Sequence, residues 1–312
     1  MNIQYFINQS QLQGKNDWLI NHKEYGQTFL EYKHFGFHKI EKNKDIIYIT
    51  LLSFNRNPSF DQSLITSMII LCQSYFYDMK IKLLKLKIDL EGVEYRNYED
   101  GSYQMNACTI IERLYYEMPE DGYCLICLID IDLYNDVRVI KPRKWIYFPR
   151  PYKNDFCYEL NSYWVSICSI ARFDPLFSID KKPNDKNTKI KSYFSLLKRC
   201  AKVVIKILSH MFGLKNCIFF CCVMNGFFSM KEFYSRLIEV CPSCLRKIFT
   251  NISRKYERLD DDGRVKNAMI ILDRLKNLSD CLKENFVGIF DKELDWYNDR
   301  IESLNKELFG EQ

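Results

Sequence analysis

The chain has 312 residues, of which 47% are hydrophobic and 27% are charged, a composition typical of a globular protein with one large core or two modest ones. The formal net charge of +5 comes from basic and acidic residues interspersed along most of the chain, so we expect no nucleic acid as a partner. No run of about 18 apolar residues occurs, and the N-terminus does not resemble an export signal. We therefore expect a soluble protein with no membrane partner.

Thirteen cysteines in a chain without an export signal indicate reduced thiols and metal ligands rather than disulfides. A cytoplasmic or nuclear protein is the expectation that follows. Cys124 and Cys127 lie within an apolar run that predicts a strand, where their odd separation sends the two side chains to opposite faces. We interpret both as thiols of the core.

Strands and helices are predicted to alternate over the N-terminal part of the chain. In chain order we expect a buried strand over 45–54, a helix over 59–79 with Ser59 as its N-cap, a strand with one wet face over 80–89, a helix over 105–118 and a central strand over 122–134. This order predicts an α/β fold with some α+β tendency and a mostly parallel or mixed sheet.

The rest of the chain is predicted to be mainly helical. We expect a long loop over 135–160, a strand over 162–173, a mobile polar loop over 180–191, a helix over 192–213 that ends at Gly213, and helices after about residue 228 with a break at 258–264. The apolar stripes over 267–304 suit a partner helix or packing on the chain's own domain, and we favour the second.

Four cysteines have the spacing of a metal site. They form a C-x4-C pair and a C-x2-C pair: Cys217, Cys222, Cys241 and Cys244. Two short-spaced thiolate pairs can close a tetrahedral shell around zinc, and Pro242 favours the tight turn that directs the second pair inward. We predict one structural zinc here, with Cys221 as a candidate substitute ligand. The alternative is four buried cysteines with no metal.

The segment around these cysteines resembles the archaemetzincin family, in particular its eukaryotic archaemetzincin-2 branch. The family signature is a zinc helix H-E-x-x-H-x-x-G-x-x-H, then a C-x4-C that contains the Met-turn C-x-M, then C-P-x-C. The matching segments are KILSHMFGLKNC, CVMN and CPSC, and the blocks NDWLINH, QSYFYDMKIKLL, IDIDLY and SIARF match upstream in the same order. The resemblance covers roughly residues 16–259 and implies a metzincin-like sheet with packed helices and a zinc-pinned, helical C-terminal subdomain.

The zinc helix departs from the family pattern at the residues that hold the catalytic metal. The resemblance places its three histidine ligands at Lys206, His210 and Asn216, so one ligand survives. Ile207 stands in place of the general base and has no titratable atom. A Lys206 ammonium would oppose a bound cation. We therefore expect no catalytic residues and no catalytic zinc.

The side chains of the degenerate motif then take other roles. Lys206 and His210 share one helix face, so we expect Lys206 to occupy part of the emptied zinc pocket, paired with a carboxylate such as Glu232. His210 is expected to be half-buried and to hydrogen-bond locally, and the resemblance makes Met224 the Met-turn of the former active site. His22, His34 and His38 lie far away along the sequence and outside the family's ligand positions.

The resulting expectation is an archaemetzincin-like pseudoenzyme with one structural zinc that binds a peptide or protein. In metzincins peptides lie along the edge strand of the sheet, so β-strand addition remains available without catalysis. The alternatives are an active zinc metallopeptidase with an unorthodox metal shell, and an interaction module built on the C-terminal helices. We expect an N-terminal extension over 1–40, a metallopeptidase-like domain over 41–259 with its zinc segment at 217–244, and C-terminal helices over 260–312.

Overall fold

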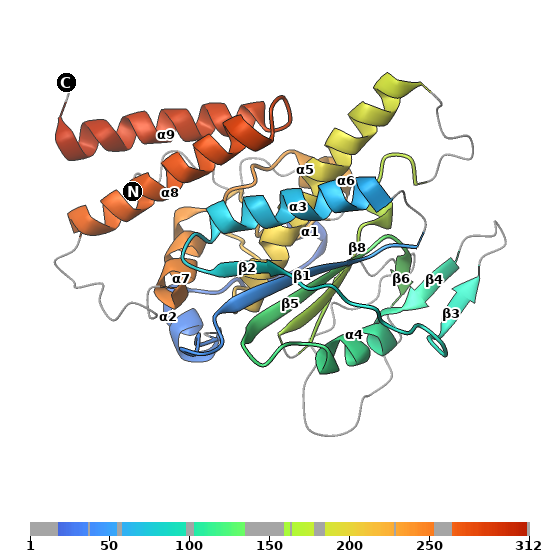
Figure 1. Cartoon of the computed structure of the whole chain (residues 1–312). Helices are drawn as coiled ribbons and strands as arrows, with labels where there is room; N and C mark the ends of the chain where they lie inside the picture. The colour runs from blue at the N-terminus through green and yellow to red at the C-terminus, as the bar shows by residue number, and fades with distance from the viewer. Residues whose placement is uncertain are drawn as a thin grey trace. The chain divides into compact units, whose positions relative to one another are not determined.

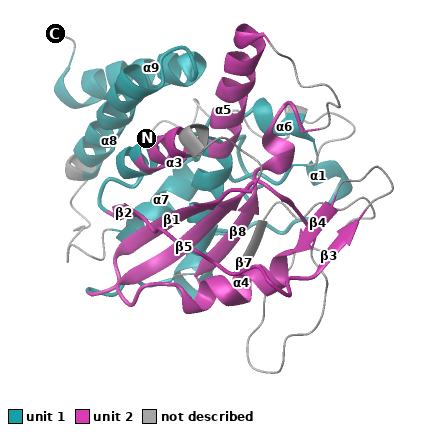
Figure 2. Ribbon diagram, turned by 45° about the vertical axis from the view of Figure 1, so that its right-hand side comes forward, with its two compact units in different colours: residues 1–42, 70–78, 201–312 teal, residues 43–69, 79–200 magenta. Residues whose placement is uncertain are grey.

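The computed structural model describes residues 18–36, 38–54, 58–97, 103–134, 159–162, 164–177, 185–227, 229–252 and 264–310. The chain divides into two compact units that alternate along the sequence (Figure 2). Unit 1 comprises residues 1–42, 70–78 and 201–312, and unit 2 comprises residues 43–69 and 79–200. The domain boundaries expected from the sequence stay predictions.

Unit 2 is built on a five-stranded sheet in the order β2-β1-β5-β8-β7. The strands are β1 (Ile46–Leu52), β2 (Lys80–Leu83), β5 (Gly122–Ile129), β7 (Glu159–Ser162) and β8 (Val165–Ser169). β1 pairs in parallel with β2 and β5, β5 pairs in parallel with β8, and β7 is an antiparallel edge strand. The predicted α/β class with a largely parallel sheet is confirmed.

Both faces of this sheet are covered, which is why β5 is buried along its whole length. On one face Leu125, Cys127 and Ile129 belong to a core cluster with Ile110 and other apolar residues of α4 (Ala107–Tyr116). Figure 1 shows α4 on one side of the sheet and the first turns of α3 (Pro58–Tyr75) on the other. Cys124 is fully buried but does not belong to the α4 cluster, so the interpretation of Cys124 and Cys127 as core thiols is confirmed.

The predicted strand over 80–89 is too long. β2 ends at Leu83, and after the Leu84 N–H donates to the Ile49 carbonyl at 2.9 Å the chain leaves the sheet. The alternating apolar residues that follow pack against the α4 cluster without joining a ladder: Leu84, Leu86, Ile88 and Leu90. The period of two therefore reflects one-sided burial and not strand pairing at these positions.

The predicted strand over 122–134 is in fact two strands of different sheets. The Asp130 carboxylate accepts the Phe54 N–H at 3.0 Å where the chain bends after β5. β6 (Asp132–Tyr134) then joins a small sheet of order β3-β4-β6 with β3 (Tyr95–Asn97) and β4 (Tyr103–Asn106). β4 also shortens the predicted helix over 105–118, because the Asn106 side chain caps α4 by accepting the Cys108 N–H at 3.0 Å.

Three other expected boundaries change. α3 begins at Pro58, so Ser59 lies in its first turn and is not its N-cap. The strand expected over 162–173 is β8 followed by a 3₁₀ helix, Ala171–Phe173. The long helix α5 (Lys186–Met211) begins inside the expected loop over 180–191, because the Asp185 carboxylate accepts the Thr188 N–H at 2.7 Å in the manner of a cap.

The expected loop over 135–160 lies outside the described residues up to 158, and its last two residues belong to β7. The expected break at 258–264 lies outside them up to 263, and so do residues 180–184 of the loop expected over 180–191.

Unit 1 contains the remaining helices of the described residues, including the end of α5. They are α1 (Trp18–Asn21), α2 (Phe29–Glu31), a π-helical turn at Tyr32–Gly36, α6 (Met230–Tyr234), α7 (Pro242–Ile252), α8 (Arg264–Asn285) and α9 (Asp291–Phe309). This agrees with the helical C-terminal region predicted from the sequence. Among the helices that the structure describes, none is long and apolar enough to span a bilayer.

Candidate metal centre

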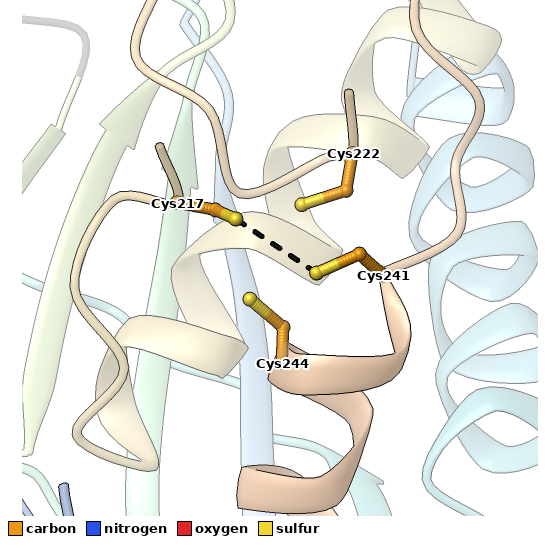
Figure 3. Close-up of side chains that lie close together, drawn as sticks. All are labelled: Cys217, Cys222, Cys241 and Cys244. Atoms are coloured by element: carbon orange, nitrogen blue, oxygen red, sulfur yellow. Dashed lines mark hydrogen bonds between the residues drawn. The ribbon is translucent and has the colours of Figure 1, made fainter. Parts of the chain in front are cut away.

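Four cysteine sulfurs meet at one point of unit 1. Cys217 and Cys222 lie in the loop after α5, Cys241 immediately precedes α7, and Cys244 lies in the first turn of α7. Their Sγ atoms all lie within 4.8 Å of one another, and all four residues are buried. Figure 3 shows the four side chains pointing toward a common centre.

The spacing of the sulfurs fits zinc. A tetrahedral shell with Zn–S bonds of about 2.3 Å places its sulfurs about 3.8 Å apart. The Sγ atoms of Cys217 and Cys241 are 3.8 Å apart (Figure 3). Four thiol ligands at this separation, shielded from solvent, form the donor set of a structural zinc site. Cys221 is half-buried and lies outside this group of four.

The thiols differ in acidity because they share one buried cluster. Hydrogen bonds from the thiols of Cys222, Cys241 and Cys244 hold the pKa of Cys217 far below its usual range. Burial raises the pKa of Cys222 well above its usual range, and hydrogen bonding to Cys217 raises that of Cys244. A metal that takes all four thiolates must therefore displace protons from Cys222 and Cys244.

A buried asparagine holds the first cysteine pair in place. The Asn225 side-chain oxygen accepts the Cys222 N–H at 2.9 Å, and its Nδ2 donates to the carbonyls of Cys217 and Phe220 at 2.7 and 2.8 Å. The Cys217 N–H donates to the Met224 carbonyl at 2.9 Å. Asn225 was missed in the sequence, although an amide directly after the C-x-M turn in an apolar stretch is the signal that could have indicated it.

Lys206 lies on the last turns of α5 and is 1% exposed. Its Nζ donates to Asn216 Oδ1 at 2.8 Å, to the Met224 carbonyl at 3.2 Å and to the Asn225 carbonyl at 2.8 Å. The two residues at the first and third ligand positions of the motif are thus hydrogen-bonded to each other. Glu232, the suggested carboxylate partner, accepts from Arg236 Nη2 at 2.6 Å.

The other positions of the degenerate motif are also accounted for. His210 is half-buried, and its Nδ1 lies 2.8 Å from the Leu214 carbonyl, so the expected local hydrogen bond is present. The side chains of Ile207 and Met224 are fully buried. Among the described residues, the four cysteines are the group that brings three or more metal-binding side chains within reach of one ion.

The N-terminal segment reaches this region, which the sequence did not indicate. Glu24 Oε1 accepts from Asn216 Nδ2 at 2.7 Å and from Trp18 Nε1 at 2.8 Å. Trp18 belongs to the NDWLINH block, and that match was the signal that could have connected the segment with the zinc helix. Glu24 itself follows the block, and no local pattern indicates its contact 192 residues away.

The curated proteins to which this chain is similar include archaemetzincin-2 and archaemetzincin-1. No family model matches the chain. Archaemetzincin-2 of Rattus norvegicus is 26% identical over 273 residues, which is 80% of this chain and 72% of the relative. Archaemetzincin-2 of Homo sapiens is 27% identical over 76% of this chain and 68% of the relative. Archaemetzincin-1 of Homo sapiens is 24% identical over 78% of this chain and 51% of the relative.

Two solved structures are similar at a lower level. The archaemetzincin of Methanopyrus kandleri has a TM-score of 0.44 and 18% identity, covering 69% of this chain and 97% of that one. The zinc-dependent peptidase of Methanocorpusculum labreanum has a TM-score of 0.45 and 17% identity, covering 65% and 99%. The similarity in sequence extends over most of the chain. Together with the zinc-helix, Met-turn and cysteine motifs in their expected order, it supports the assignment of the chain to the archaemetzincin family.

Proposed function

We propose that this chain is a non-catalytic archaemetzincin that holds one structural zinc and binds a peptide or protein in place of hydrolysing it. The observation that carries the proposal is the position of the Lys206 ammonium, 2.8 Å from Asn216 Oδ1 at the family's third ligand position. A buried cation at this place repels a metal ion. Ile207 has no atom that could take a proton from a metal-bound water.

The structural zinc is assigned to Cys217, Cys222, Cys241 and Cys244. A bound ion would join the loop after α5 to the start of α7. These two segments do not belong to the same helix or strand. Structural zinc of this kind contributes directly to the free energy of folding, whether or not the protein has a reaction to catalyse. A structural role for the zinc explains why the four cysteines are present although the catalytic motif is degenerate.

The binding role is supported by the sheet topology. β2 and β7 form the two edges of the described five-stranded sheet, and β7 is the antiparallel one. An extended peptide can add to such an edge through main-chain hydrogen bonds, a mode that needs no metal. We assign the peptide to the β7 edge. Slowed amide exchange in residues 159–162 on addition of a bound peptide is the expected sign.

Zinc content tests the proposal. Inductively coupled plasma mass spectrometry should give about one zinc per chain in the wild type and a value near zero in Cys241→Ser. Cys221→Ser is the matched control, because Cys221 adjoins Cys222 but lies outside the four-cysteine group, and it should keep its zinc. About two ions per wild-type chain, with one kept in Cys241→Ser, would favour the active metallopeptidase and call for assays with peptide substrates.

A further inference from the structure

We propose that the degenerate zinc motif has become a carboxylate-binding site, and that its ligand is Glu24 of the chain's own N-terminal segment, residues 18–36. The inference deepens the proposed function and rests on one part of it, the absence of a catalytic metal beside Lys206. It names the chemistry that the site recognises and identifies the group that occupies it. All the residues involved belong to unit 1.

The site is built from donors that converge on one carboxylate oxygen. Asn216 Nδ2 donates to Glu24 Oε1 at 2.7 Å, and Trp18 Nε1 donates to the same oxygen at 2.8 Å. The Asn216 amide has one orientation that satisfies both of its neighbours. Lys206 Nζ must face the Asn216 oxygen, so the Asn216 NH₂ group faces Glu24.

Charge explains why a carboxylate is the preferred occupant. The Lys206 ammonium is buried, and its hydrogen bonds to Asn216, Met224 and Asn225 go to uncharged oxygens. Glu24 supplies a negative charge one amide group away, which offsets part of the cost of burying the cation. Such a chain of hydrogen bonds polarises each member, so a charged acceptor at its end binds more strongly than a neutral one.

The carboxylate keeps capacity for one more donor. Glu24 Oε2 is buried and has no hydrogen-bond partner among the described residues. A carboxylate accepts through both oxygens, so this atom can take a further N–H or O–H group. The donors among the described residues therefore hold the carboxylate through Oε1 alone.

The rest of the segment is fixed over the same motif. Gln27 Nε2 donates to the Gly213 carbonyl at 3.1 Å, and Gln27 Oε1 accepts the Lys215 N–H at 3.2 Å. The Tyr32 hydroxyl donates to the Phe212 carbonyl at 3.0 Å. These contacts satisfy main-chain groups at the end of α5 that the helix itself leaves unpaired.

Two glycines allow the segment to lie this close. Gly213 has a φ of +88°, and a Cβ atom there would lie 1.5 Å from the Gly36 carbonyl oxygen. A Cβ atom at Gly226 would lie 2.3 Å from Trp18 Nε1. Residues 18–36 thus cover the degenerate motif from its glycine turn to the residues after Met224. A ligand that seeks the Lys206–Asn216 pair has to bring a carboxylate of its own and displace Glu24.

Hydrogen exchange with mass spectrometry on the full chain tests the inference. Glu24→Ala removes the atoms of one acetate ion, so exchange in residues 18–36 and 213–226 should rise together by about tenfold or more, the effect of losing a charge-assisted hydrogen bond. Added acetate should restore protection in both segments, and uncharged acetamide of the same shape should not. Glu31→Ala is the matched control, since Glu31 bonds Thr28 within its own turn and should alter exchange only there.

Unchanged exchange in 213–226 in Glu24→Ala, or equal rescue by acetate and acetamide, would overturn the inference. Protection of α8, which belongs to the same unit, shows that unit 1 of the variant has folded. If it has not, Asn216→Asp keeps an oxygen for Lys206 but replaces the donor to Glu24 with a second carboxylate, so exchange in both segments should rise. Unchanged exchange in Asn216→Asp would also overturn the inference. Zinc content reports on the catalytic metal independently of hydrogen exchange. Failure of the proposed function can therefore be distinguished from failure of this inference.

Discussion

Lys206 shows how one side chain changes what a buried position can hold. Histidine at the first ligand position presents a neutral nitrogen lone pair to a metal, whereas the lysine here presents three N–H groups and a full positive charge. Oxygens of Asn216, Met224 and Asn225 satisfy those N–H groups. The ammonium thereby joins the loop residue at the third ligand position to the Met-turn, a connection made without a metal ion.

Removing the ammonium should destabilise the protein. Lys206→Met keeps the apolar length of the side chain but removes three hydrogen bonds. The Met224 and Asn225 carbonyls keep the Cys217 N–H and Arg236 Nη1 as donors, whereas Asn216 Oδ1 loses the Lys206 donor. We expect the free energy of unfolding to fall by about 2–4 kcal/mol. Urea denaturation measures the change. Lys215→Met is the control, because the Lys215 side chain is exposed and its loss should cost under about 0.5 kcal/mol. Equal stability of Lys206→Met and wild type would show that the buried charge is not structural.

At the level of elements, the C-terminal helices are fixed to their own unit by one buried carboxylate. Glu239 Oε1 accepts from the Tyr75 hydroxyl at 3.0 Å, and Oε2 accepts from the Tyr297 hydroxyl at 3.0 Å. Arg274 of α8 pairs with both oxygens, at 2.9 and 3.1 Å. α3, α8 and α9 each contribute one of these side chains. The preference for packing of 267–304 on the chain's own domain agrees with these contacts.

Breaking this pair should therefore affect folding before any partner binding. Arg274→Met leaves Glu239 buried without its cation, and we expect a loss of about 3–5 kcal/mol in the free energy of unfolding. Adding Glu239→Gln to Arg274→Met removes the orphan charge and should recover part of that loss. Denaturant titration of the two variants provides the measurement. A smaller loss in Arg274→Met than in the double variant would contradict the role given to the charge.

The same cluster predicts a loss of stability in alkali. Burial, and next the Glu239 charge, raise the pKa of Tyr75 and of Tyr297 well above the usual value of 10.0. The folded protein therefore keeps two protons that the unfolded chain releases near pH 10, and the free energy of unfolding falls as pH rises through and beyond about 10. Tyr297→Phe should show a shallower decline in urea titrations between about pH 9 and 11. If the free energy of unfolding declined equally in wild type and variant, ionisation of Tyr297 would not be the cause.

At the level of the whole molecule, stability should depend on zinc. Because the four cysteines connect the loop after α5 to the start of α7, removing the ion should lower the free energy of unfolding by several kcal/mol, by analogy with other structural zinc sites. Thermal unfolding with and without a chelator measures this, and re-addition of zinc should restore the transition. An unchanged transition in a chain shown to have lost its zinc would mean that the four thiols pack without needing the metal.

The sequence by itself indicated the resemblance to archaemetzincins, the α/β class and the group of four cysteines, and it showed that residues other than histidine stand at two of the family's three ligand positions. These features depend on spacings of a few residues, and the chain geometry turns such spacings directly into shared helix faces, alternate strand faces and closed metal shells. The orientation of Cys124 and Cys127 toward opposite faces followed in the same way. Local periodicity is a property of the chain before it folds.

Tertiary structure alone decided which distant groups meet. Leu84, Leu86 and Ile88 alternate as a strand would, yet β2 ends at Leu83 and these side chains pack against the α4 cluster. Glu24 contacts Asn216 across 192 residues, and Tyr75 contacts Glu239 across 164. No local pattern encodes such pairs, because each carboxylate is placed by the packing of several elements at once. The segment around Lys206 and Asn216 is therefore covered by contacts that became visible only in the folded chain.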